Sequence, residues 1–74
     1  MGRLTPLKPA VVIRILQKLG FVAVRQKGSH IFFRHPDGRC TVVPFHKGED
    51  LGRGMIRTIL NDIETPWEEF IAAR

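Results

Sequence analysis

The sequence predicts an α+β fold of two layers, in which helices pack on one face of a three-stranded antiparallel sheet. Apolar residues recur at helical spacing near both ends of the chain. The segment between them is rich in β-forming residues and is divided by glycine and proline turns. The expected order is one helix, three strands, a second helix and a short third helix. Because the chain has 74 residues, we expect a single domain over residues 1–74.

The first helix is expected to begin at Pro9 and to end at Gly20. Proline suits a first helical turn, where no backbone N–H is needed, and glycine is common just past a helix end. Between them the apolar positions fall at i, i+3, i+4 and i+7, namely Val12, Ile15, Leu16 and Leu19. This stripe predicts the face that packs on the sheet.

The middle of the chain is expected to form three strands, Phe21–Gln26, Ser29–Arg34 and Arg39–Val43. Gly28 separates the first two strands, and a Pro-Asp-Gly turn at positions 36–38 separates the second from the third. A proline ends the third strand, because proline cannot donate to the hydrogen-bond ladder.

Side chains along the second strand alternate between two faces. Ile31 and Phe33 share one face, which the helices are expected to cover because a three-stranded sheet needs a packing partner. His30, Phe32 and Arg34 therefore share the open face.

The second helix is expected from about Leu51 to Ile63. Its apolar stripe is made of Ile56, Ile59, Leu60 and Ile63. The segment Thr65–Glu68 has the pattern of a capping box with proline at the first helical position, which predicts a third helix that ends near Ala73.

Charge is distributed unevenly along the chain, whose formal net charge is +5. Residues 1–36 contain seven lysines and arginines and no acid, whereas residues 62–74 contain four acids and one base. This asymmetry favours a polyanionic partner, most often nucleic acid, over a basic face that is merely solvated.

A single cysteine, Cys40, excludes an internal disulfide and leaves no second cysteine to share a metal. A lone thiol is compatible with a reducing compartment. No apolar run near the start has the length of a signal peptide or a membrane span, so we expect a cytoplasmic protein.

His30 is the candidate for catalysis. It is either an ordinary surface residue, a phosphate contact or a group that moves protons, since histidine is suited to acid–base chemistry near neutrality. RNA carries its own nucleophile in the 2′-hydroxyl. One histidine that takes this proton, or donates one to the leaving 5′-oxygen, can therefore cleave RNA without a metal or cofactor, and nearby cations would stabilise the phosphorane.

The other histidines are weaker candidates. His35 lies in the hairpin turn and is expected to be a turn residue, whereas His46 could reach the same face as His30. No histidine pair has metal-ligand spacing, so we expect no metal site.

The cations around the hairpin form a basic rim, which is either merely solvated or contacts phosphates; they are Arg25, Lys27, Arg34, Arg39 and Lys47. Phe32 is expected to stack on a base or to lie beneath a partner protein.

Five short segments, taken in order, resemble the HicA family of toxins: Leu19–Phe21, Lys27–His30, Arg34–Arg39, Val43–His46 and Gly54–Leu60. The resemblance extends from about residue 16 to residue 70. The Gly-Ser-His strand start followed by Pro-x-His is its most specific part. The segment 61–67 departs from the family pattern, which predicts different packing of the C-terminus.

The resemblance implies a double-stranded-RNA-binding-like fold and a ribonuclease that cleaves messenger RNA. It also implies a HicB-type antitoxin that binds and blocks the toxin in a hetero-oligomer. His30 matches the family's catalytic histidine. The expected RNA-contacting residues are Arg25, Lys27, Ser29, Phe32, Arg34 and His46. Two alternatives remain, a non-catalytic RNA-binding module of the same fold and a domain that binds only protein.

Overall fold

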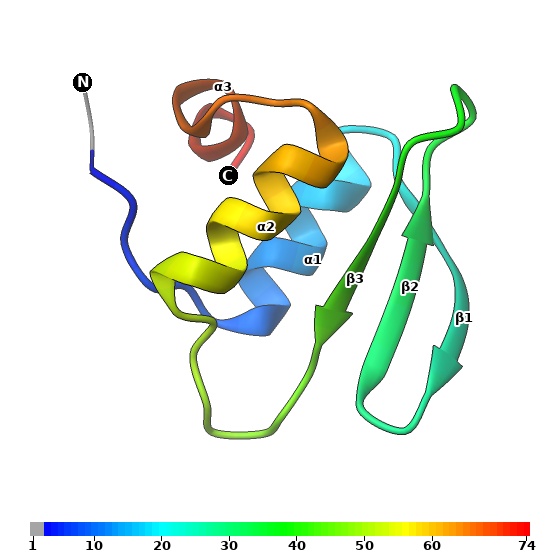
Figure 1. Ribbon diagram of the computed structural model, residues 1–74, viewed down its shortest axis with the longest axis horizontal. Coiled ribbons are helices and arrows are strands. Elements are labelled where there is room, and N and C mark those ends of the chain that lie inside the picture. Colours follow the sequence, from blue (N-terminus) through cyan, green and yellow to red (C-terminus); the bar gives the residue numbers. More distant parts are fainter. Residues whose placement is uncertain (1–2) are drawn as a thin grey trace.

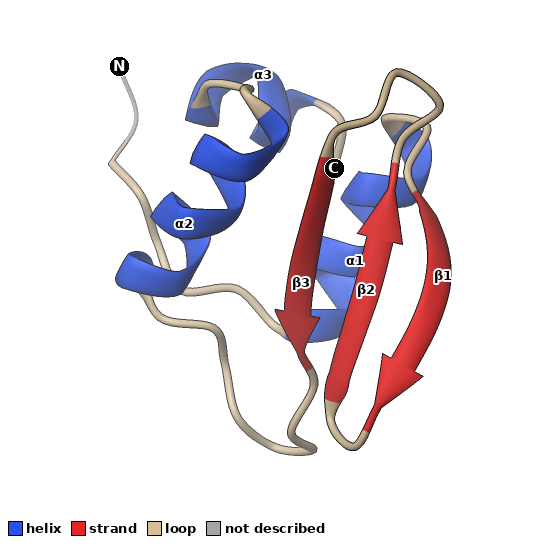
Figure 2. Cartoon of the chain, turned by 45° about the vertical axis from the view of Figure 1, so that its right-hand side comes forward, coloured by secondary structure: helices blue, strands red, loops and turns tan. Residues whose placement is uncertain are grey.

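The computed structural model describes residues 3–74 and confirms the predicted α+β fold (Figure 1). The first two residues of the predicted domain lie outside the described part. The elements are α1 (Pro9–Lys18), β1 (Val22–Lys27), β2 (His30–Arg34), β3 (Cys40–Pro44), α2 (Arg53–Ile63) and α3 (Trp67–Ala72). The antiparallel strands follow the order β1-β2-β3, and the helices lie on one side of the sheet (Figure 2).

The end of α1 shows why glycine occupies position 20. Gly20 has φ +97° and its N–H donates to Gln17 O, while the N–H of Phe21 donates to Leu16 O. These two bonds form a Schellman motif, which satisfies carbonyls that the helix end leaves free. The chain therefore turns directly into β1, and Phe21 enters the core instead of the strand.

The core lies between the two long helices and the inner face of β2 and β3. Both predicted helical stripes contribute to it, as do Phe33 at 1 % exposure and Val43 at 0 %. The stripe residue Leu19 is only half-buried at its margin. The helices leave β1 uncovered. All six residues of β1 are exposed, including Val22 at 57 % and Val24 at 60 %, so β1 is a free edge strand.

The second helix begins two residues later than predicted, because the backbone of Leu51 pairs with the lead-in and is not helical. Its backbone forms an antiparallel bridge with Leu7, with N–O distances of 2.7 and 3.1 Å in the two directions. Both leucines are buried. The proline-rich lead-in is thus anchored to the segment that precedes α2.

The predicted capping box at Thr65 is wrong. The Thr65 hydroxyl donates to Ile63 O at 3.0 Å, and α3 begins at Trp67 with Pro66 as its N-cap. Glu64 takes a left-handed conformation at φ 54° and ends α2. The threonine hydroxyl therefore satisfies a carbonyl at the end of α2 and does not cap the start of α3. The third helix still packs on the core through Phe70, which is fully buried.

None of the helices in the described part of the chain has the length and apolar character needed to cross a membrane.

Candidate nucleic-acid interface

The sheet face opposite the helices is built from three cross-strand rows. Residues paired across antiparallel strands lie on the same face. The rows, which we call the open face, are Lys27–His30–Pro44, Arg25–Phe32–Val42 and Val22–Arg34–Cys40. Three of these nine residues are cations and none is an acid. The open face is therefore positive, as the sequence predicted for a polyanion-binding surface.

His30 is the first residue of β2, and its side chain is exposed. It follows Gly28, which adopts a left-handed φ of +58°, and pairs with Lys27 on one side and Pro44 on the other. The tight turn through Gly28 thus places an accessible imidazole at one end of the positive face. An accessible imidazole on a rigid strand is suited to proton transfer with a bound ligand.

Phe32 is less exposed than an unpartnered surface aromatic would be. Its ring is half-buried, and the guanidinium carbon of Arg25 lies 4.7 Å from the ring centroid. This geometry is a cation–π contact. Arg25 and Phe32 therefore act as one unit, and either its guanidinium plane or its ring can stack on a base.

Ser29 and His46 are brought together although they lie 17 residues apart. The Ser29 hydroxyl and His46 Nε2 share a hydrogen bond of 3.3 Å, whose direction depends on the imidazole tautomer. The N–H of Phe45 also donates to the Ser29 carbonyl at 2.6 Å. The segment after β3 therefore lies beside the start of β2. His46 contacts the neighbour of His30, at the same end of the sheet.

His35 is a structural residue, as predicted for the turn. Its ring packs edge-on against Phe21, with a centroid separation of 5.0 Å, and is close to Gly20. A Cβ at position 20 would lie 2.9 Å from His35 Nε2. His35 Nδ1 lies 3.1 Å from both the Asp37 backbone nitrogen and Asp37 Oδ1, so the protonation state decides which contact forms a hydrogen bond.

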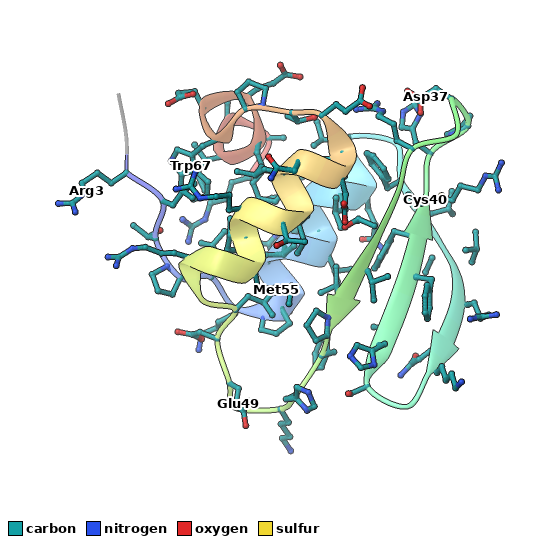
Figure 3. All side chains as sticks on the ribbon, viewed as in Figure 1. Arg3, Asp37, Cys40, Glu49, Met55 and Trp67 are labelled. Carbon is teal, nitrogen blue, oxygen red and sulfur yellow. The ribbon has the colours of Figure 1, made fainter. Side chains whose placement is uncertain are left out.

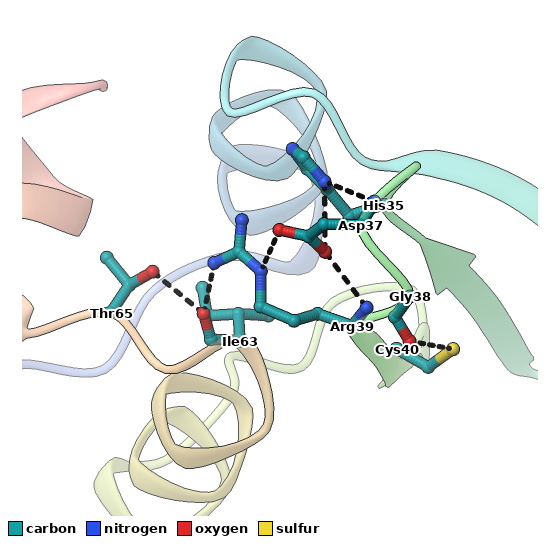
Figure 4. Close-up of polar contacts among 7 residues, drawn as sticks. All are labelled: His35, Asp37, Gly38, Arg39, Cys40, Ile63 and Thr65. Atoms are coloured by element: carbon teal, nitrogen blue, oxygen red, sulfur yellow. Dashed lines mark hydrogen bonds and ion pairs between the residues drawn. The ribbon is translucent and has the colours of Figure 1, made fainter.

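Arg39 also has a structural role rather than a place on the basic rim (Figure 4). Its Nε donates to Asp37 Oδ2 at 2.8 Å, and one terminal nitrogen donates to the Ile63 carbonyl at the end of α2. The guanidinium carbon lies 5.2 Å from the Phe21 ring centroid. The backbone N–H of Arg39, and then its side chain, lower the pKa of Asp37 from its ordinary value of 3.8. Arg39 therefore connects the hairpin turn to the helical layer.

The structure thus brings all seven predicted site residues to the sheet or its end. Sequence reasoning missed four members of the open face, although the register of the hairpins would have indicated them: Val22, Cys40, Val42 and Pro44. Within residues 3–74 no group of three or more His, Cys, Asp or Glu side chains could hold a metal ion.

Residues 11–64 match the family model of the HicA toxin of bacterial toxin–antitoxin systems. The matched segment contains all three strands, most of α1 and the whole of α2. It therefore includes every residue of the open face and the Ser29–His46 contact. No curated protein matches the chain.

Proposed function

The chain belongs to the HicA toxin family, and we propose that it is a metal-independent endoribonuclease that cleaves messenger RNA, with His30 as its catalytic residue. One observation carries this proposal. An exposed imidazole lies at the end of a cationic, acid-free sheet face, on the strand start where the family resemblance expects a catalytic histidine.

The reaction needs no group beyond the RNA and the protein. The 2′-oxygen attacks the adjacent phosphorus, the bond to the 5′-oxygen breaks, and the products end in a 2′,3′-cyclic phosphate and a 5′-hydroxyl. His30 takes the 2′-hydroxyl proton or gives a proton to the leaving 5′-oxygen. One such group typically contributes about 10²–10⁴-fold to the rate. Lys27, the cross-strand neighbour of His30, stabilises the charge on the phosphorane.

The remaining open-face residues hold the RNA strand. Arg25 and Arg34 contact phosphates, which gives affinity without sequence preference. The Arg25–Phe32 unit stacks on a base next to the scissile bond. The Ser29–His46 pair contacts the backbone at the same end of the sheet as His30.

The toxin family implies an antitoxin partner, and we assign a HicB-type antitoxin to the open face. A partner seated there would cover His30 and the cations and so block RNA. The free edge of β1, with Val22 and Val24 exposed, adds apolar surface and unpaired backbone groups to the same region. Such edges and patches are typical of protein interfaces.

The experiment is a cleavage assay on single-stranded RNA in excess EDTA, with the ends of the products identified. The wild type should release 2′,3′-cyclic phosphate ends and should leave a fully 2′-O-methylated copy of the RNA intact. His30→Ala, purified in parallel and shown by circular dichroism to be folded, serves as the control for contaminating nucleases.

Three results would contradict the proposal. Activity that disappears in EDTA would contradict the metal-independent mechanism. Equal cleavage by His30→Ala would contradict the assignment of His30 as the catalytic residue. Salt-sensitive RNA binding without cleavage would instead assign the chain as a non-catalytic RNA-binding module.

A further inference from the structure

A second cationic region lies on the helical side of the molecule, away from the open face. It is a pocket of about 520 Å³ between the lead-in, α2 and the start of α3. Its lining includes Arg3, Arg53, Arg57, Asn61 and Trp67. Figure 3 shows Arg3 and Trp67 on this side of the molecule, away from the strands, with the Arg3 side chain extending outwards.

The three arginines of the pocket are not neutralised by the protein. The ion pairs among the described residues involve Lys8, His35 and Arg39, and none involves Arg3, Arg53 or Arg57. Arg53 and Arg57 are one helical turn apart on α2, a spacing at which like charges repel. No acidic residue among those that the structure describes lines the pocket. An anion bound between the arginines would relieve this repulsion.

The pocket is also partly preorganised. Arg53 Nε donates to the Leu4 carbonyl at 2.8 Å, so its guanidinium is held against the lead-in, and both residues line the pocket. Trp67 is half-buried, with its ring centroid 6.3 Å from that of Phe70 at an interplanar angle of 30°. One fixed arginine, two further arginines and a supported indole combine phosphate recognition with a stacking surface for a base.

We propose that this pocket is a second RNA site, which binds one phosphate through the arginines and stacks the adjoining base on Trp67. It deepens the proposed function, on which it rests for the class of ligand. The molecule is 34 Å along its longest dimension. A stacked strand, which rises about 3.4 Å per phosphate, covers this length with roughly ten nucleotides. Longer RNAs should bind more tightly because they occupy both sites.

The pocket can be tested directly because Trp67 is the chain's only tryptophan and the chain has no tyrosine. Its fluorescence, excited at the red edge of its absorption, therefore reports on this site alone. The full-length chain carrying His30→Ala is titrated with five- and twenty-nucleotide RNAs and, separately, with a heptaglutamate peptide. The same titrations are repeated after adding Arg57→Gln or, as a matched charge control, Arg14→Gln.

Arg57 is the residue to change because its side chain is exposed and is used by no described ion pair. Arg14 is an exposed arginine on α1 that does not line the pocket. We expect saturable quenching by both RNAs, with the longer one binding more tightly. Arg57→Gln should weaken the affinity about tenfold, the loss expected for one charged hydrogen bond. It should also lower the salt slope by about 0.7, whereas Arg14→Gln should change neither value.

Two results would overturn the proposal. One is quenching that is absent or unchanged by Arg57→Gln. The other is quenching by heptaglutamate at lower concentration than by RNA, which would assign the pocket to an acidic protein segment. Neither depends on RNA cleavage. If the wild type cleaves RNA but RNA does not quench Trp67, only the proposal of a second RNA site is contradicted. If RNA quenches Trp67 but the wild type does not cleave it, only the catalytic assignment is contradicted.

Discussion

Two adjacent phenylalanines on β2 provide a matched pair of substitutions, because strand alternation sends them to opposite faces. Phe33 is 1 % exposed beneath the helices, whereas Phe32 is half-buried on the open face under Arg25. Phe33→Ala should therefore reduce stability strongly and Phe32→Ala weakly. For RNA affinity, Phe32→Ala should have a larger effect than a substitution of Phe33 that leaves the chain folded.

The expected magnitudes follow from these environments. Truncation of a buried phenylalanine costs about 3–5 kcal/mol. A domain of this length has a total stability of roughly 4–11 kcal/mol, so Phe33→Ala should remove a large share of it and, at the lower end of this range, unfold the isolated chain. Phe32→Ala loses about half of a phenylalanine's burial energy, which is ~1.5–3 kcal/mol in full. It also loses a cation–π contact of about 0.5–1 kcal/mol, which gives about 1.3–2.5 kcal/mol in total.

Thermal and urea unfolding followed by circular dichroism measure the stabilities. Each kcal/mol should shift Tm by about 4–8 °C in a domain of this size. RNA affinity is compared in Phe32→Ala and in Phe33→Leu, which keeps an apolar core side chain and should stay folded. Loss of one stacked base should weaken binding by about 1–3 kcal/mol in Phe32→Ala and leave Phe33→Leu unchanged. A larger stability loss in Phe32→Ala than in Phe33→Ala would refute the assignment of the two faces.

Two further predictions concern the hairpin turn and its contacts. Gly20→Ala should destabilise by more than the ~1–2 kcal/mol of left-handed strain, because the new Cβ would also clash with His35. Gly38→Ala, at φ +101° in open space, should show the strain alone, and equal losses of Tm would contradict the clash. The folded-state pKa of Asp37 lies below its ordinary 3.8. Its stabilising contribution is therefore present above that value and lost as pH falls through the folded-state pKa. Asp37→Asn should accordingly lose less Tm than the wild type on acidification below pH ~4, and an equal loss would argue against a role for this carboxylate.

Local patterns in the sequence were enough to predict most of the fold. The stripes of α1 and α2, the proline and glycine at the ends of α1, and the alternation along β2 depend on residues within one or two turns of each other. The structure confirms these features because nothing long-range overrides them. The side on which His30 lies follows from the same alternation.

The features that sequence could not predict depend on contacts between distant residues. Arg39 would be assigned to the basic rim from its position alone, but the end of α2 lies within reach of its side chain. The Thr65 hydroxyl likewise lies between the end of α2 and the start of α3. The left-handed conformation of Glu64 directs it to the Ile63 carbonyl at the end of α2.

The candidate site shows the same division. The seven predicted residues could be selected by type and position, whereas the contact between Ser29 and His46 required the path of the chain after β3. The pocket that contains Trp67 was not predicted, because its arginines come from the lead-in and from α2.

The central claim is that His30 performs proton transfer in RNA cleavage, and single-turnover kinetics test it most directly. RNA is mixed rapidly with saturating protein in EDTA, and the cleavage rate is measured for wild type, His30→Ala and His35→Gln. The Kd of each protein is measured with the uncleavable 2′-O-methylated RNA. We expect His30→Ala to cleave about 10²–10⁴-fold more slowly at an unchanged Kd, and folded His35→Gln to retain the wild-type rate. A His30→Ala rate close to that of the wild type, or a loss explained entirely by weaker binding, would contradict the account.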